Sequence, residues 1–135
     1  MRLEEIKTGE EELRVMIESG LVLREAGRLD EAEKIFRGVN ELVPHSDVPL
    51  VALSSIAARR GNFDEALHLC DKALQQVPES LFARVNRAEI LLYQQRREEA
   101  EAELHEIIET DPDSPHSKTA EVLLDVARMI PEQIA

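Results

Sequence analysis

The chain repeats itself at an interval of 34 residues, and this interval constrains the fold more than any other feature of the sequence. Four residue columns keep it through three successive units: Pro44, Pro78 and Pro112; Ala32, Ala66 and Ala100; Ser46, Ser80 and Ser114; and Glu31, Glu65 and Glu99. Gly27 and Gly61 share the interval through two units. A fixed period of roughly 20–50 residues is the sequence signature of stacked repeats, so we expect an array of similar units.

Each column has a physical role in a unit made of two helices. Glycine adopts the left-handed conformation that ends a helix at little cost. The alanine lies one turn into the second helix, where a small side chain lets two helices approach closely. Proline lacks the N–H that a helix needs and therefore ends the second helix. The serine two residues later predicts an N-cap for the next helix.

The spacing predicts seven helices. First helices are expected over about 10–25, 47–60 and 81–94, second helices over about 29–42, 63–76 and 97–110, and a seventh over about 115–130. Thr8 and Glu11 have capping-box spacing and predict the start of the first helix. The predicted organisation is an N-terminal arm or start of the first helix over 1–12, three units over 13–46, 47–80 and 81–114, and a C-terminal capping helix and tail over 115–135.

The composition narrows the classes of partner. The chain has 28 acidic and 16 basic residues, a formal charge of −12. Binding to a nucleic-acid backbone needs clustered Lys and Arg, so we expect no nucleic-acid partner. The longest apolar runs are too short to cross a bilayer, and the first six residues have a net negative side-chain charge and no apolar run, so we expect no membrane insertion and no signal peptide. A single cysteine, Cys70, cannot form an internal disulfide, and we expect a cytoplasmic protein.

The pattern resembles the tetratricopeptide repeat family. The segment Gly61-Asn62-Phe63-Asp64-Glu65-Ala66, followed by Lys72-Ala73-Leu74 and Pro78, carries the likeness best. Gly20, Ser54 and Ala88 stand at the small first-helix position of the family. The resemblance implies an all-α fold, a right-handed α–α superhelix of three helix pairs plus a capping helix. It also implies a protein that binds other proteins and has no cofactor.

The third unit departs from the family pattern. Gln95-Arg96 replaces the turn glycine, which predicts a tighter or more strained turn. Arg84 and Arg87 replace large apolar residues. Their aliphatic stems are expected to cover apolar surface while the guanidinium groups reach water or a carboxylate.

In this family the first helices line a concave groove, and residues at offsets of three, seven and ten share one stripe of a helix. The residues that we expect to bind a partner in the groove are apolar: Ile17, Leu21, Val48, Val51, Phe82, Val85 and Leu92. We expect Val51, Phe82 and Val85 to be partly exposed in the free protein. The alternative is that several of these residues are ordinary core residues of helices buried on two sides.

An apolar groove excludes the carboxylate clamp of co-chaperones with this fold. Ile17, Leu21, Ala52 and Phe82 stand at the matching places, and only Asn86 is polar. A narrower resemblance is to the class II chaperones of bacterial type III secretion, through the run Ala88-Glu89-Ile90-Leu91-Leu92 followed by Glu99-Ala100-Glu101. It implies a client that is a translocator or, in the related chaperones, a needle subunit. The alternative function is a structural adaptor subunit of a larger assembly.

Nothing in the sequence predicts catalysis or a metal site. The four histidines have no metal-ligand spacing, and no phosphate-binding glycine motif occurs. Acidic residues crowd the second helix of the third unit: Glu98, Glu99, Glu101, Glu103, Glu106, Glu109, Asp111 and Asp113. This surface is interpreted as a solvated convex face, or alternatively as a docking surface for a basic partner. We therefore expect a non-enzymatic protein with a protein or peptide client, in a homo- or hetero-oligomer.

Overall fold

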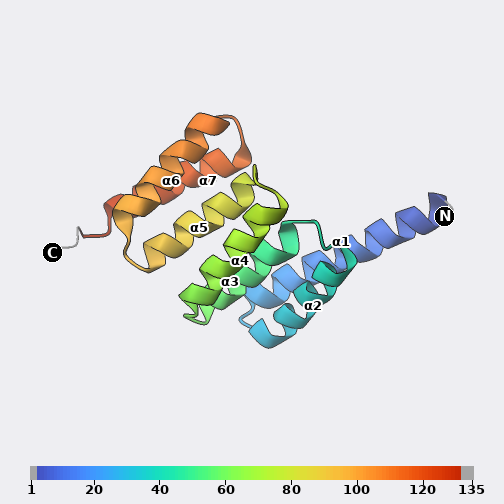
Figure 1. The fold of residues 1–135 in the computed structure, drawn as a ribbon. Helices are drawn as coiled ribbons and strands as arrows, with labels where there is room; N and C mark the ends of the chain where they lie inside the picture. The colour runs from blue at the N-terminus through green and yellow to red at the C-terminus, as the bar shows by residue number, and fades with distance from the viewer. Residues whose placement is uncertain (1–2, 132–135) are drawn as a thin grey trace.

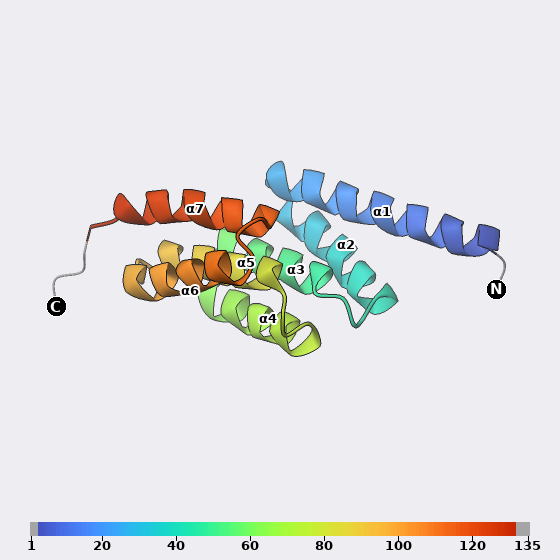
Figure 2. The same cartoon turned by 90° about the horizontal axis from the view of Figure 1, so that it is seen from above.

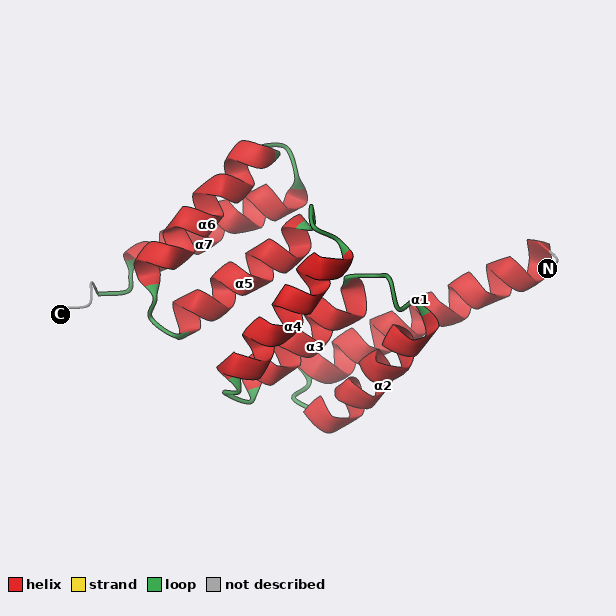
Figure 3. Ribbon diagram, viewed as in Figure 1, coloured by secondary structure: helices red, strands yellow, loops and turns green. Residues whose placement is uncertain are grey.

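A computed structural model describes residues 3–131, with side chains from residue 9 onward. Within that range the chain forms seven helices and no strand (Figures 1 and 3). The helices are α1 (Leu3–Glu25), α2 (Leu29–Leu42), α3 (Val48–Arg59), α4 (Phe63–Gln76), α5 (Leu81–Tyr93), α6 (Arg97–Thr110) and α7 (Pro115–Arg128). Six of the seven lie within two residues of the predicted bounds.

The helices pack in sequence order as three pairs with a seventh helix at the end. α1 packs on α2, α3 on α4 and α5 on α6, and α7 contacts both α6 and α5. The second helix of each unit also contacts the first helix of the next, as α2 does with α3 and α4 with α5. Viewed from above, α1 and α7 lie at the two ends of the array, and α4 lies on the opposite side from them (Figure 2).

The turn between the two helices of each unit is closed by one residue with a positive φ. Gly27 and Gly61 have φ values of 79° and 80°, and Gln95 has 59° in the third unit. In every case the next amide donates a hydrogen bond to a carbonyl five residues back, as Asn62 does to Ala57 at 2.9 Å. This is the Schellman geometry that satisfies a carbonyl at the end of a helix. The prediction of a strained third turn is confirmed, because Gln95 has a Cβ, which is sterically unfavourable at a positive φ.

The predicted helix ends are confirmed with one change. Ser80 caps α5, accepting a hydrogen bond from the Ala83 amide at 3.0 Å. Ser114 caps α7 in the same way. In the second unit the N-cap is Asp47, one residue after the predicted Ser46. The Ser46 hydroxyl still accepts from the Val48 amide at 3.2 Å, so the serine supports the same turn from one position earlier.

The predicted start of the first helix is wrong. α1 begins at Leu3, so Thr8 and Glu11 lie inside the helix and do not cap it. Strong helix formers, including Leu3 and Lys7, precede Thr8, and no proline interrupts them. Of the two possibilities for the segment 1–12, an arm or the start of the first helix, the described residues from Leu3 onward form the first part of a long helix. Met1 and Arg2 lie outside the described residues.

The core is built from small residues facing larger ones across each helix pair. Ala32, Ala66 and Ala100 have no exposed surface, which confirms the predicted close contact between helices. At the C-terminal end, Ala120 and Leu124 of α7 pack against the buried residues of α5 and α6. Leu104, Ile107 and Ile108, which α7 was predicted to cover, all belong to this cluster. The seventh helix therefore covers apolar surface of the third unit, as a capping helix does.

Candidate protein-binding face

The face expected to bind a partner is formed by one side of the first helix of each unit, and α7 extends it. We call it the first-helix face. Its members share four positions of the 34-residue register: Arg14, Ile17, Leu21 and Arg24 on α1; Val48, Val51, Ser55 and Ala58 on α3; Phe82, Val85, Glu89 and Leu92 on α5; and His116, Thr119, Leu123 and Val126 on α7.

The exposure of the predicted groove residues divides them into two sets. Phe82 and Leu21 are each 36% exposed, and Val48 and Ile17 are half-buried. Val51, Val85 and Leu92 are only 2%, 6% and 6% exposed.

The expectation that Val51 and Val85 are partly exposed is therefore wrong. Val51 belongs to the buried cluster centred on α3 and α4. Val85 packs with residues of α6 and α7, and Leu92 packs with Ala100 and Ala127. First helices in the middle of the array contact helices on several sides, so these positions are filled by their neighbours. The interpretation as ordinary core residues holds for these three side chains.

A ring stack that the sequence reasoning missed lies at one end of the face. The rings of Phe82 and His116 are stacked, with centroids 5.6 Å apart and planes 26° from parallel. The signal was present, because His116 follows Phe82 by the same 34 residues that relate the other columns. The stack joins α5 to α7 and leaves an aromatic surface partly open to solvent, with Val126 exposed on the same face.

The opposite end of the face, on α1, is basic. The Arg24 guanidinium donates to the Ser55 hydroxyl of α3 at 3.3 Å and to the Glu25 carboxylate at 3.2 Å, and its buried Nε has no partner. Arg59 shares the same carboxylate at 2.8 Å. Two guanidinium groups therefore hold one carboxylate at the end of α1.

Charge on the face differs from that of the chain. Among its 16 register positions the only acid is Glu89, whereas Arg14 and Arg24 are basic, in a chain whose formal charge is −12. Glu89 accepts a hydrogen bond from the Tyr93 hydroxyl at 3.0 Å. Burial, and then the Glu89 carboxylate, raise the pKa of Tyr93 above its ordinary value. A client would thus meet apolar surface with little of the acidity that covers the rest of the molecule.

A buried polar cluster joins the second unit to the third. The Asn86 amide donates to the Ser54 hydroxyl at 2.9 Å and to the Cys70 sulfur at 3.1 Å, and Ser54 donates to the Ala66 carbonyl at 2.7 Å. Burial raises the pKa of the Cys70 thiol, which these hydrogen bonds only partly offset. The amide of Asn86, the one polar residue at a clamp position, is thus engaged by Ser54 and Cys70, and the Cys70 thiol is buried, as is typical of an inert thiol.

The acidic second helix of the third unit is partly neutralised from α5. Arg84 contacts Glu106 at 2.8 Å and Glu103 at 3.3 Å, and Arg87 lies 3.7 Å from Glu103. This confirms the prediction that the two arginines reach carboxylates. Across the described residues no group of His, Cys, Asp and Glu side chains is arranged to hold a metal ion. In the same range no helix is long and apolar enough to span a membrane.

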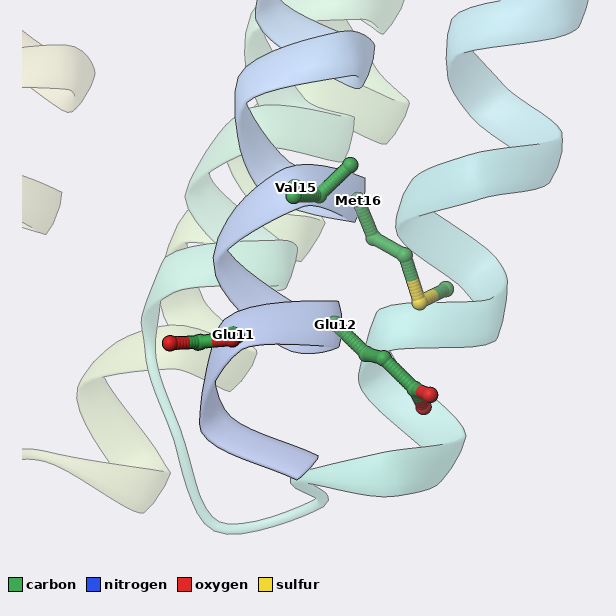
Figure 4. A pocket seen from close by; sticks show the side chains of 4 residues that line it. All are labelled: Glu11, Glu12, Val15 and Met16. Carbon is green, nitrogen blue, oxygen red and sulfur yellow. The ribbon is translucent and has the colours of Figure 1, made fainter. Parts of the chain in front are cut away.

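A surface pocket that was not predicted lies on α1. Its volume is about 520 Å³, and Glu11, Glu12, Val15 and Met16 of α1 line it (Figure 4). Met16 reaches toward α2, where its methyl group would lie 3.5 Å from a Cβ added at Gly38. The pocket is therefore on the outer end of the array and not on the first-helix face.

Stacked helix pairs, positive-φ turns and a first-helix face define a helical-repeat scaffold for binding proteins. A family model described as tetratricopeptide repeat matches residues 57–124, and the chain belongs to this family. Its right-handed superhelix of three helix pairs and a capping helix is the fold of solved family members.

Two solved structures and one curated protein illustrate the likeness. The Yersinia enterocolitica type III secretion chaperone SycD, in complex with a peptide of the translocator YopD, superposes with a TM-score of 0.69 at 19% identity, over 88% of this chain and 94% of that one. The first repeat domain of Spaghetti (RPAP3), bound to an HSP90 peptide, gives a TM-score of 0.68 at 21% identity, over 88% and 92%. At these identities the likeness concerns the fold alone.

The curated relative is subunit 3 of the anaphase-promoting complex of Schizosaccharomyces pombe. It is 28% identical over 94 residues, which is 70% of this chain. The chain spans only 14% of the length of that subunit.

Proposed function

We propose that the chain holds an apolar segment of a client protein on the first-helix face, as a type III secretion chaperone holds a translocator. The observation that carries the proposal is the exposed apolar surface of Leu21, Phe82 and Val126 on a face whose 16 register positions include a single acid. The complex of SycD with a translocator peptide supports it, since that neighbour has the same fold and binds a client segment.

The physical basis is the burial of apolar surface that both molecules otherwise expose to water. Each Å² of apolar surface removed from water contributes about 25 cal/mol, from which the cost of ordering the client is subtracted. The Phe82–His116 stack offers a flat aromatic surface for such contact, since the planes of the two rings lie 26° from parallel with centroids 5.6 Å apart. A client held in this way would keep its apolar segment out of water until release. A needle subunit satisfies the same chemistry as a translocator.

A second candidate function is that of an adaptor subunit built permanently into a larger assembly. The match to a subunit of the anaphase-promoting complex supports this function, although it covers a small part of that protein. An adaptor would use its end helices or convex side, so substitutions on the first-helix face would leave its partners bound.

The test is co-expression with the apolar secreted proteins encoded beside the gene, followed by co-purification. Phe82→Asp and Leu21→Asp place a charge on the face at side chains that water still reaches. The matched control is Val122→Asp on α7, since Val122 is 62% exposed and lies off the first-helix face. We expect folded variants of Phe82 and Leu21 to lose the client while the control keeps it. A client retained by both face variants would overturn the proposal, and partners kept by all three variants would favour the adaptor.

A further inference from the structure

The outer end of α1 is a second exposed apolar surface. The equivalent positions of the later units are covered by a neighbouring helix. Val15 and Val22 are 55% and 68% exposed. The residues at the same register position as Val15 are Pro49, Ala83 and Ser117, and those matching Val22 are Ile56, Ile90 and Leu124. All six are buried. α1 thus exposes the positions that every later first helix buries.

The helix that buries these positions is the second helix of the preceding unit. Ser117 of α7 donates hydrogen bonds to the carbonyl groups of Ile107 and Asp111, at the end of α6. Leu124 packs with Leu104 and Ile107 of the same helix. α3 and α5 contact α2 and α4 in the corresponding way. The face of α1 that carries Val15 and Val22 is therefore shaped to receive a helix, and no helix of the described residues covers it.

At the opposite end of the array, the surface of α7 that would contact a further helix carries more charged side chains. On α7 the positions that would face a further second helix are occupied by Lys118, Glu121 and Asp125, and by one apolar residue, Val122, which is 62% exposed. In the second unit the same register positions are Leu50, Leu53 and Ala57, which are buried. The corresponding surface of α7 is mostly charged, although Val122 is exposed there, whereas the exposed face of α1 carries Val15, Val22 and the pocket beside Val15 and Met16. Exposed apolar surface of this kind marks an interaction site.

The charged side chains beside Val15 and Val22 indicate what kind of partner this surface of α1 can bind. Glu11 and Glu12 line the pocket, and Glu18 lies between the two valines, where it contacts Arg14 at 3.9 Å. Three carboxylates and one guanidinium leave this end acidic. A second copy of the chain would bring its own carboxylates against them, and like charges at an interface oppose association.

We propose that this end of α1 binds a basic amphipathic helix of a partner protein, in the place that a preceding second helix would occupy. Its apolar side lies on Val15 and Val22, and its Lys or Arg side chains face Glu11, Glu12 and Glu18. This surface is separate from the first-helix face, and the proposal does not rest on the proposed function.

The probe is derived from α6, the helix that packs against α7 as the proposed partner helix would pack against α1. A fluorescently labelled peptide with the α6 sequence, Arg97–Thr110, is held helical by a lactam bridge on its exposed side. In the basic peptide, lysine replaces the exposed acids Glu98, Glu99, Glu106 and Glu109. The unaltered acidic peptide presents the same apolar side and is the charge control. Binding to the full chain is measured by fluorescence anisotropy at low and high salt.

We expect the basic peptide to bind, the acidic peptide to bind at least tenfold more weakly, and salt to reduce the difference. Val22→Asp should weaken binding of the basic peptide at least tenfold, while Val122→Asp and Phe82→Asp leave it unchanged. Equal binding of the two peptides, or no binding of either, would overturn the proposal. So would self-association of the chain that Val22→Asp abolishes, because the occupant would then be a second copy.

Discussion

Gly20 of α1 lies directly against the ring of Phe36 of α2, so closely that a Cβ at Gly20 would be 2.7 Å from two ring carbons. The same pair of positions is Ser54 and Cys70 in the second unit and Ala88 and Leu104 in the third. A larger residue on one helix is matched by a smaller one on the other. Each helix pair therefore reaches close packing with its own combination of side-chain volumes.

Gly20→Ala should destabilise the protein although alanine is the better helix former. The gain in helix propensity is about 1 kcal/mol, whereas overpacking a buried contact costs about 1–3 kcal/mol. Phe36 has no exposed surface and no room to move away. The control is Gly9→Ala, since nothing lies within 4 Å of a Cβ at Gly9, and this change should stabilise α1. The urea midpoint of unfolding is measured for both variants. A higher midpoint for Gly20→Ala than for the wild type would contradict the close contact.

Gln95→Gly should stabilise the third unit. Gln95 has a φ of 59°, a region where a Cβ costs roughly 1–2 kcal/mol. Glycine avoids this strain but loses more entropy on folding, so we expect a net gain of about 0.5–1 kcal/mol. The reciprocal change, Gly61→Ala, should lose about 1 kcal/mol for the same reason. A Gln95→Gly variant that melts below the wild type would show that the side chain of Gln95 makes an important contact.

Removal of α7 by truncation after Ser114 should cost several kcal/mol, comparable with the whole stability of a domain this size. The truncation exposes the cluster of Leu104 and Ile107 that Ala120 and Leu124 cover. Burial of apolar surface contributes about 25 cal/mol per Å². Differential scanning calorimetry should show a large fall in melting temperature or aggregation. A truncated chain that melts like the full one would exclude a capping role for α7.

Val51→Asp and Val85→Asp should disrupt folding itself. Both side chains are buried, and a carboxylate placed there loses most of its solvation, so we expect losses of about 4 kcal/mol or more. Phe82→Asp should cost far less, because 36% of Phe82 is already in water. Thermal melting of the three variants measures the difference. Native-like melting of the two valine variants would contradict the burial of these residues and would favour an exposed groove.

The Cys70 thiol should make stability fall at alkaline pH. Burial raises its pKa in the folded state, so the unfolded chain loses this proton first as pH rises. The contribution is complete below the ordinary thiol pKa, about 8.5, and is lost as pH rises toward the raised folded value. Urea midpoints between pH 7 and 10 measure the decline. Cys70→Ala should reduce the alkaline slope, and an unchanged slope would mean that the thiol does not contribute.

Much of this fold follows from the sequence because local chemistry decides where each helix begins and ends. Gly27 and Gly61 adopt the left-handed turn that other residues resist, and proline prevents each second helix from continuing. These effects act within a few residues of the chain, so one sequence and its 34-residue period were sufficient to place them. The exception is α1, where Thr8 and Glu11 have the spacing of a cap but the preceding residues form a helix equally well.

Exposure could not be predicted in the same way, because it depends on which helix covers a side chain. Val51 and Val15 are both apolar residues of first helices, and their positions in the repeat do not separate a groove residue from a stacking residue. The tertiary structure buries Val51 among α3 and α4, and it leaves Val15 open because none of the described helices covers it. Helix formation is local, whereas burial depends on contacts between segments far apart in the chain. The sequence therefore determined the repeats, and only their stacking decided which apolar side chains remain in water.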